Sequence, residues 1–340
     1  MIWILSDGKA GHLSQTRGLA MALIKCRGGQ IREIGLEGKG FFGKLKAMWE
    51  EKSKGKNQKL KNLDSTVENC QPDYIISAGH GTHLPLLLCG WLYKKAKTVV
   101  CMKPSFPMRW FDFCIVPRHD LSPELLAKPP AHIIPTFGAI NGVHPSPERP
   151  KTHTLMLIGG PSKEYGWDGK QVIEQLKAVS SQQPPSPRLQ RTGGTEDGGK
   201  MAEDGGRTKF LLTTSRRTPA GFVDALRKEC PSIEVVPVEE TPRGWIAEKL
   251  AGATAVWVTR DSVSMIYEAL GSGAPVGLLN MIPHGGVTAE KSRVGKGIEM
   301  LEGDGRVTSF DIWKGTGSLK SKGALVEVDR VADMLVKLIL

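Results

Sequence analysis

The feature of this sequence that most restricts its fold is a short apolar run followed by a glycine-containing polar loop and then by a helical pattern. Residues 1–5 form the first run and residues 6–11 the loop, and apolar positions at helical spacing then continue to Leu23. The unit recurs at residues 74–94 and leads to a further apolar run at residues 98–102. Short apolar runs indicate buried strands, whereas a period near 3.6 residues indicates helices. Strands that alternate with helices predict a parallel sheet, with ligands bound at the carboxyl ends of its strands.

This pattern is interrupted once, which predicts two domains. After strands expected at 113–116 and 132–135, residues 141–153 combine proline with polar side chains and lack an apolar period, as a linker does. A second series follows, with strands expected at 154–158, 209–213, 233–237, 255–259 and 275–279.

We therefore expect a Rossmann-like domain over residues 1–145 and a second over residues 146–325. A terminal helix over residues 326–340 is expected to return and brace the first domain. Residues 180–208 are rich in glycine, proline and charge and have almost nothing to bury, so they are expected to form a disordered surface insertion in the second domain.

The composition limits the cellular compartment and the classes of partner to be expected. Forty-six Lys and Arg against 35 Asp and Glu give a net charge of +11. This charge favours an anionic partner, but it is spread too evenly for a nucleic-acid-binding arm, so nucleic acid is not expected. The six cysteines show no zinc spacing, and no run approaches the roughly 20 apolar residues that span a bilayer. The expected protein is cytoplasmic and has neither metal nor cofactor, and peripheral contact with a membrane is left open.

The loop after the first apolar run carries the first candidate site. It reads SDGKAGH over residues 6–12 and matches neither GxGxxG nor the Walker pattern, which disfavours dinucleotide binding and ATP hydrolysis. His12, at the start of the helix, can take a proton from an attacking hydroxyl, and Asp7 is the second choice of base. The competing interpretation is that His12 only caps or packs the helix start. The remaining residues that we assign to this loop and to the acceptor are Gly8, Lys9, Gly11 and Gln15.

The second candidate site lies where the strand expected at 255–259 meets a helix expected at 262–270. Asp261 or Ser262 can cap this helix, and its first-turn amides together with the hydroxyls of Ser262 and Ser264 suit a diphosphate. Glu268 lies further along the helix, where its carboxylate can accept both hydroxyls of a ribose. An ordinary capped helix with a solvated glutamate is the alternative. The donor site is thus assigned to Ser215, Arg216, Arg260, Asp261, Ser262, Ser264, Met265 and Glu268.

Two other segments have chemistry suited to anions. The loop TTSRRTP at residues 213–219 offers hydroxyls and guanidinium groups to phosphate oxygens, although a capping turn with a solvated arginine explains Arg217 equally well. Residues 39–61 hold eight lysines and five large apolar side chains at helical spacing. That pattern is typical of an amphipathic element on an anionic bilayer, and a solvated disordered loop is the competing interpretation.

The motifs resemble known families. The GxxGH of residues 8–12, with Arg260 eight residues before Glu268 and then Gly273 and Pro275, resembles the GT-B glycosyltransferases, including the enzymes that make lipid II. In that family the arginine and the ribose-binding glutamate belong to the donor site. SDGKAGHLSQTRGLA and TRDSVSMIYEALGSGAPV resemble more closely the elongated-mitochondria fission proteins and their bacterial relatives, over nearly the whole chain outside residues 180–208.

These resemblances imply two Rossmann-like domains that face each other across a GT-B-like cleft, with the acceptor bound by the first and a nucleotide-sugar donor by the second. The expected reaction moves a sugar to an acceptor hydroxyl; the acceptor is unknown, and a lipid-linked one is an option. No DxD motif occurs in the chain, so a metal-independent reaction is expected. The alternative function is a non-catalytic scaffold that acts at membranes, as the organelle-fission relatives suggest.

Overall fold

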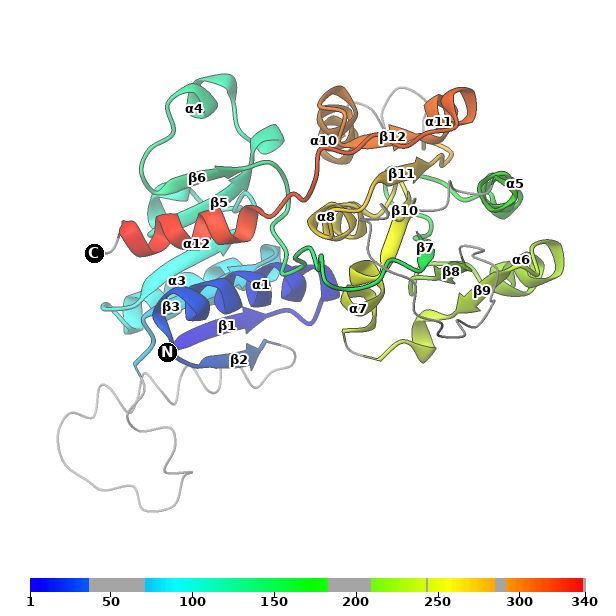
Figure 1. Cartoon of the computed structure of the whole chain (residues 1–340). Coiled ribbons are helices and arrows are strands. Elements are labelled where there is room, and N and C mark those ends of the chain that lie inside the picture. Colours follow the sequence, from blue (N-terminus) through cyan, green and yellow to red (C-terminus); the bar gives the residue numbers. More distant parts are fainter. Residues whose placement is uncertain (37–70, 183–208, 243, 285–291, 339–340) are drawn as a thin grey trace, which may run out of the picture. The chain divides into compact units, whose positions relative to one another are not determined.

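The computed structural model describes residues 1–36, 71–182, 209–242, 244–284 and 292–338 (Figure 1). The chain divides into two units, one made of Met1–Val143 with Leu325–Leu340 and the other of His144–Ala324. Each unit contains a six-stranded parallel sheet. The predicted α/β class with two Rossmann-like halves is therefore confirmed. The facing of the two halves across a cleft stays a prediction.

The first sheet has the strand order β2-β1-β3-β4-β5-β6. Its strands are β1 (Ile2–Ser6), β2 (Ile31–Gly35), β3 (Tyr74–Ala78), β4 (Lys97–Cys101), β5 (Phe113–Pro117) and β6 (Ile133–Thr136). Because β1 pairs with β2 on one side and with β3 on the other, the strand order reverses between β1 and β3. Ligands of open parallel sheets bind at the carboxyl ends of the strands at such a switch point.

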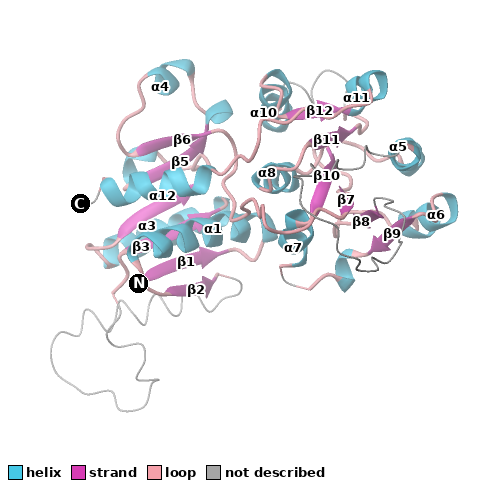
Figure 2. Ribbon diagram, viewed as in Figure 1, coloured by secondary structure: helices cyan, strands magenta, loops and turns pink. Residues whose placement is uncertain are grey.

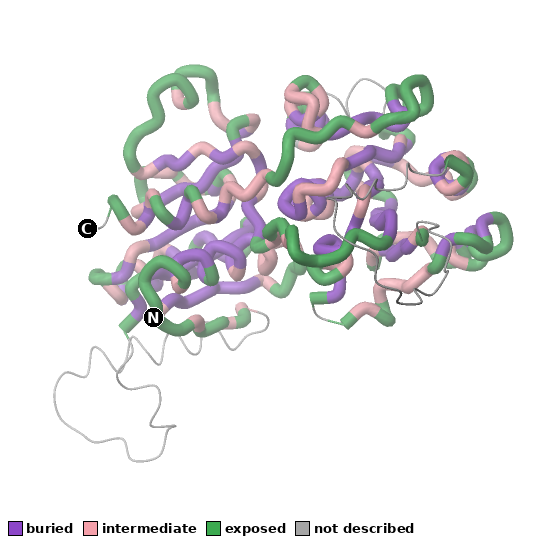
Figure 3. The backbone as a smooth tube through the Cα atoms, in the orientation of Figure 1, coloured by how far each residue is buried: buried purple, intermediate pink, exposed green. Residues whose placement is uncertain are grey.

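Helices cover both faces of this sheet, because alternate residues of a strand point to opposite sides (Figure 2). Ile2 and Ile4 of β1 pack in one core with α1 (Ala10–Arg27) and α12 (Glu327–Lys337). Trp3 and Leu5 pack in another with α3 (His83–Leu92). All strands of this sheet except the edge strand β2 are correspondingly buried along most of their length (Figure 3). The shorter helices of this unit are η1 (His80–Thr82), η2 (Met108–Trp110), η3 (Arg118–Asp120) and α4 (Pro123–Ala127).

The terminal helix α12 belongs to the first unit and lies beside α1 (Figure 1). Its apolar face consists of Val328, Val331, Ala332 and Leu335, all fully buried in the core that holds α1. Its first residue, Glu327, accepts a hydrogen bond from the Phe137 amide at 3.0 Å and pairs with Arg330. Burial alone would raise the pKa of Glu327, but these two partners lower it, so the carboxylate is charged when it anchors the helix.

The second sheet has the strand order β12-β11-β10-β7-β8-β9, which reverses between β7 and β10. Its strands are β7 (His153–Leu157), β8 (Lys209–Thr213), β9 (Ile233–Val236), β10 (Ala253–Thr259), β11 (Val276–Leu279) and β12 (Val307–Ser309). Its helices are α5 (Gly169–Ser181), α6 (Phe222–Glu229), η4 (Val238–Glu240), α7 (Trp245–Ala251), α8 (Val263–Gly271), α10 (Arg293–Gly303) and α11 (Phe310–Thr316). Figure 1 shows α7 and α8 on the face opposite to α5 and α6.

Several local expectations need correction. The edge strands β2 and β12 were not predicted, and β2 carries exposed Arg32 and Glu33, so it lacks the apolar run of a buried strand. The first two residues of the expected insertion, 180 and 181, belong instead to α5, which continues to Ser181; residues 183–208 lie outside the described part of the chain. His153, placed in the linker, is the first residue of β7, where its Nε2 lies 3.0 Å from the Lys249 carbonyl oxygen. Within the described ranges, no helix is long and apolar enough to cross a membrane.

Candidate functional site

In the first unit, the switch point holds a histidine and an aspartate in direct contact. Asp7 follows β1, and His12 lies in the first turn of α1. The Nδ1 atom of His12 is 3.0 Å from each carboxylate oxygen of Asp7. Both side chains are mostly buried, with 22% and 16% of their surfaces exposed, respectively. The two residues that the sequence suggested as alternative bases are therefore one pair.

The protonation of this pair follows from its surroundings. Burial alone would raise the pKa of Asp7, but hydrogen bonding and charge from His12, with help from Lys9, lower it. Asp7 is thus an ionised acceptor, so the His12 Nδ1 must carry the proton that is shared with it. In the neutral ring the lone pair then lies on Nε2, which is the nitrogen able to accept a proton from a substrate.

Gly79, the residue after the neighbouring strand β3, makes room for this pair. Its φ of +96° lies in the left-handed region that favours glycine. A Cβ atom at this position would lie 2.3 Å from His12 Nδ1 and 2.9 Å from Asp7 Oδ2. The backbone after β3 therefore packs directly against the pair.

Sequence reasoning missed three polar side chains at the carboxyl ends of the neighbouring strands β3 and β4. His80 follows Gly79, and its Nδ1 forms a short hydrogen bond with the Ser105 hydroxyl after β4. His83 is 2% exposed, and its Nδ1 accepts a hydrogen bond from the Ser105 amide nitrogen at 3.2 Å. Burial, with the nearby charges of His80 and His12, lowers the pKa of His83, so this ring is neutral. The polar cluster thus spans the carboxyl ends of β1, β3 and β4.

The other residues predicted for the first loop have different roles in the structure. Gly8 has a φ of +75° and its amide donates to Ser6 Oγ at 3.0 Å, so it forms the turn. Lys9 is the residue before α1 and its side chain is largely exposed, and Gly11 lies in the first turn. Gln15 is only 6% exposed; its amide nitrogen reaches Met102 Sδ at 3.5 Å. It therefore joins α1 to the residue that follows β4.

In the second unit, the predicted cap of α8 is wrong. Ser262 is the residue before the helix, but its side chain makes no capping hydrogen bond. The Asp261 carboxylate is fully buried and instead accepts the Gly160 amide at 3.1 Å and the Arg217 Nη2 at 2.7 Å. The first-turn amides of a helix have no acceptor within the helix. Those of α8 are thus left without a side-chain cap from Asp261 or Ser262.

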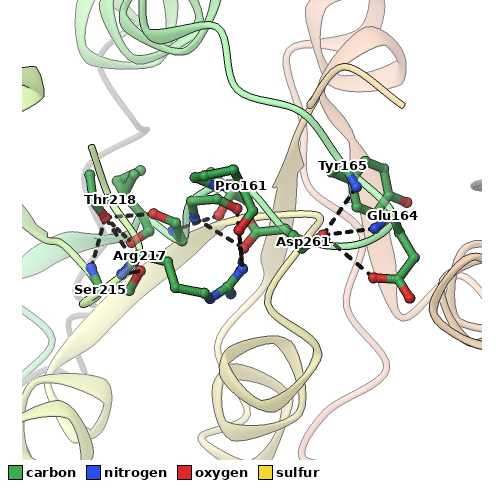
Figure 4. Close-up of polar contacts among 12 residues, drawn as sticks. Pro161, Glu164, Tyr165, Ser215, Arg217, Thr218 and Asp261 are labelled. Carbon is green, nitrogen blue, oxygen red and sulfur yellow. Dashed lines mark hydrogen bonds and ion pairs between the residues drawn. The ribbon is translucent and has the colours of Figure 1, made fainter. Parts of the chain in front are cut away.

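Arg217 joins the loops that follow β7, β8 and β10 (Figure 4). Its Nη1 donates to the carbonyl oxygens of Gly160 at 3.2 Å and Pro161 at 3.1 Å, while Nη2 binds Asp261. Thr218 extends the link, because its hydroxyl contacts the Gly159 carbonyl oxygen. Sequence reasoning left the role of Arg217 open; the structure makes it the centre of this cluster.

The predicted donor residues differ in how they are engaged. Ser215 belongs to the turn after β8, where its amide donates to Thr218 Oγ1 at 2.9 Å. Arg216, in the same turn, is exposed. Arg260 forms a close ion pair with Glu302 of α10, so its charge is shared with a carboxylate. The half-buried residues Ser264, Met265 and Glu268 lie along the first two turns of α8.

Two signals in the sequence could have identified the site residues that sequence reasoning missed. The run GHGTH at residues 79–83 follows an expected strand, so the switch-point rule places its histidines at the ligand edge. The paired glycines 159 and 160 also follow a strand, and a Cβ on Gly159 would lie 2.2 Å from Asp261 Oδ2.

Within the described residues no three His, Cys, Asp or Glu side chains are grouped so as to hold a metal ion. Residues 39–61, predicted to contact membranes, lie outside the described part of the chain.

Two parallel sheets, each with polar loops at its switch point, define an α/β protein with two Rossmann-like halves. The family described as Mitochondrial fission ELM1 matches residues 10–189 and 199–339, and the chain belongs to this family. One relative is an uncharacterised protein, RP120, of Rickettsia prowazekii (strain Madrid E). It is 24% identical over 319 residues, which cover 81% of this chain and 82% of the relative.

Solved structures that are similar to this chain include a MurG and an epimerase. MurG of Acinetobacter baumannii has a TM-score of 0.45 and 10% identity, over 99% of this chain and 92% of its own. The UDP-GlcNAc 2-epimerase of Neisseria meningitidis, solved with UDP-GlcNAc, has a TM-score of 0.48 and 11% identity, over 99% of both chains.

Proposed function

We propose that this chain is a glycosyltransferase that moves a sugar from a nucleotide-sugar donor to an acceptor hydroxyl without a metal ion. The observation that carries the proposal is the Asp7–His12 pair, whose ring nitrogen lies 3.0 Å from both carboxylate oxygens at a switch point. A buried carboxylate that fixes the tautomer of a histidine is the arrangement of a general base.

The acceptor chemistry is assigned to the first unit. His12 Nε2 would take the proton of the acceptor hydroxyl as its oxygen attacks the anomeric carbon, and the ionised Asp7 would stabilise the imidazolium that results. Gly79 keeps the space around the ring free for this arrangement, because any side chain there would displace His12.

The donor chemistry is assigned to the second unit. As the bond from the anomeric carbon to the diphosphate breaks, negative charge develops on the leaving group. The first-turn amides of α8, with the hydroxyls of Ser262 and Ser264, would stabilise this charge. Arg216 would add a guanidinium, with a smaller share from Arg260 because Glu302 already neutralises much of its charge. Glu268 would accept the ribose hydroxyls.

The role of Glu268 can be tested by calorimetry. Glu268→Gln should weaken nucleotide-sugar binding by about 1–3 kcal/mol, because a charged acceptor of ribose hydrogen bonds becomes neutral. Glu299→Gln, which removes an exposed carboxylate from α10 of the same unit, is the matched control and should leave the affinity unchanged. Equal affinity of the Glu268 variant and the wild type would remove Glu268 from the donor site.

We also propose that residues 39–61 contact an anionic membrane. Each basic residue near an anionic surface contributes about 1 kcal/mol, and salt screens this attraction. The protein should therefore sediment with anionic vesicles at low ionic strength and be released at high ionic strength. Replacement of Lys44, Lys46, Lys52 and Lys54 by Glu should abolish sedimentation. If the fourfold variant sediments as the wild type does, this segment is not the membrane contact.

A non-catalytic scaffold at membranes is the alternative function, favoured by membership of a mitochondrial fission family. A scaffold does not need a tautomer-fixed histidine at a switch point, which is why we prefer the enzyme. Turnover of any nucleotide sugar by the wild type decides between them.

A further inference from the structure

Asp261 occupies a position from which an aspartate ordinarily caps a helix N-terminus. It directly precedes Ser262, the residue before α8, so a capping orientation would bring its carboxylate to the positive end of that helix. Carboxylates near a helix N-terminus are stabilised there, both by hydrogen bonds from free amides and by the helix dipole. The structure shows a different arrangement: the carboxylate is turned toward the loops after β7 and β8.

Two contacts hold the carboxylate in that direction. Its Oδ2 accepts hydrogen bonds from Arg217 Nη2 at 2.7 Å and from the Gly160 amide at 3.1 Å. The Oδ1 atom is buried and has no hydrogen-bond partner among the described residues. Because a buried, unpaired carboxylate oxygen is costly, this orientation depends on the charge of Arg217.

The surrounding backbone provides the space for this orientation. A Cβ on Gly159 would lie 2.2 Å from Asp261 Oδ2, so the carboxylate fills the volume that a side chain would need. Arg217 is fixed in turn, since its Nη1 is bound to two carbonyl oxygens of the same loop (Figure 4). Its side chain is 43% exposed, but both terminal nitrogens have partners.

We propose that Arg217 is a positioning residue for the donor diphosphate: it holds the Asp261 carboxylate away from the first turn of α8 and so keeps the amides of that turn open to phosphate. This inference rests on the donor site proposed above. Without Arg217, the Asp261 carboxylate is released and is attracted to the helix N-terminus, where it competes with the diphosphate. The competition is between two anions for one set of amides.

The test is a set of variants of the full chain, titrated by calorimetry with UDP, ADP, GDP, CDP and dTDP. Arg217→Gln should lower the affinity for the diphosphate that the wild type binds, by about tenfold or more. Addition of Asp261→Ala should restore most of this affinity, because the competing anion is gone. Arg227→Gln, which removes an exposed charge from α6 of the same unit, should bind as the wild type does.

The recovery of affinity in the double variant distinguishes a positioning role of Arg217 from a direct contact with phosphate and from a role in folding alone. If Arg217 contacts the phosphate directly, or if its loss only unfolds the loops, the double variant binds no better than Arg217→Gln, and the inference is wrong. Arg217→Lys gives the same comparison where the glutamine variant does not fold, since one ammonium cannot replace the fork that joins two carbonyls and a carboxylate. If the wild type binds a diphosphate and Arg217→Gln binds it equally, the inference alone fails. If the wild type binds none of the five, the proposed donor site fails and the inference fails with it.

Discussion

His12→Ala is expected to lower the turnover of sugar transfer by about 10²–10⁴-fold, the usual contribution of a general base. Donor affinity should stay nearly unchanged, because His12 belongs to the first unit and the proposed donor residues belong to the second. The measurement is turnover and melting temperature of the same variant, on a donor identified by a nucleotide-sugar screen. His132→Ala is the matched control: His132 immediately precedes β6, so it lies at the end of the sheet opposite to the carboxyl ends.

A structural His12 would behave differently. Loss of a packed side chain costs stability, of the order of 1–2 kcal/mol, without slowing the molecules that remain folded. A lower melting temperature with undiminished turnover per folded molecule would therefore show that His12 is not the base.

Gly160→Ala is expected to lower the free energy of unfolding by about 1–3 kcal/mol, the usual cost of overpacking. A Cβ at this position would lie 2.2 Å from the Arg217 carbonyl oxygen, which is backbone and cannot rotate away. The Arg217 side chain also holds the Gly160 carbonyl, so the two loops cannot separate without loss of the Asp261 cluster.

Urea unfolding of Gly160→Ala and Gly315→Ala gives the comparison. Gly315 lies in α11, and nothing lies within 4 Å of a Cβ there. Alanine in an open helical position should be neutral or should stabilise by roughly 0.5–1 kcal/mol. If both variants unfold at the same urea concentration as the wild type, the close approach of the β7 and β8 loops is not present in solution.

The strands that form the centre of each sheet were predictable because buried parallel strands are continuously apolar. The run at residues 1–5 predicted β1, and the run at 255–259 predicted most of β10. Edge strands lack that signal: β2 presents Arg32 and Glu33 to solvent, so its period is not that of a buried strand.

The candidate sites were only partly predictable, for a related reason. Asp7 and His12 are five residues apart, so the local sequence brought both to attention, but only the folded turn shows that they form a pair. His83 begins α3 and Ser105 lies in the loop after β4, and their contact depends on the pairing of β3 with β4. Contacts across strand ends are set by the topology and leave no local pattern.

The cap of α8 illustrates how local reasoning fails at such a place. An aspartate before a helix is a normal capping signal, and nothing in residues 255–270 argues against it. Arg217 lies 44 residues earlier in the chain, and its ion pair with Asp261 overrides the local preference.

The central claim, that this chain binds a nucleotide sugar through α8 and transfers the sugar through His12, is tested most directly by calorimetric titration of the full chain with a panel of nucleotide sugars. The wild type should bind one nucleotide class saturably, Glu268→Gln should lose about 1–3 kcal/mol of that binding, and His12→Ala should keep it. If the wild type binds no member of the panel, or if His12→Ala loses binding as strongly as Glu268→Gln does, the account is contradicted.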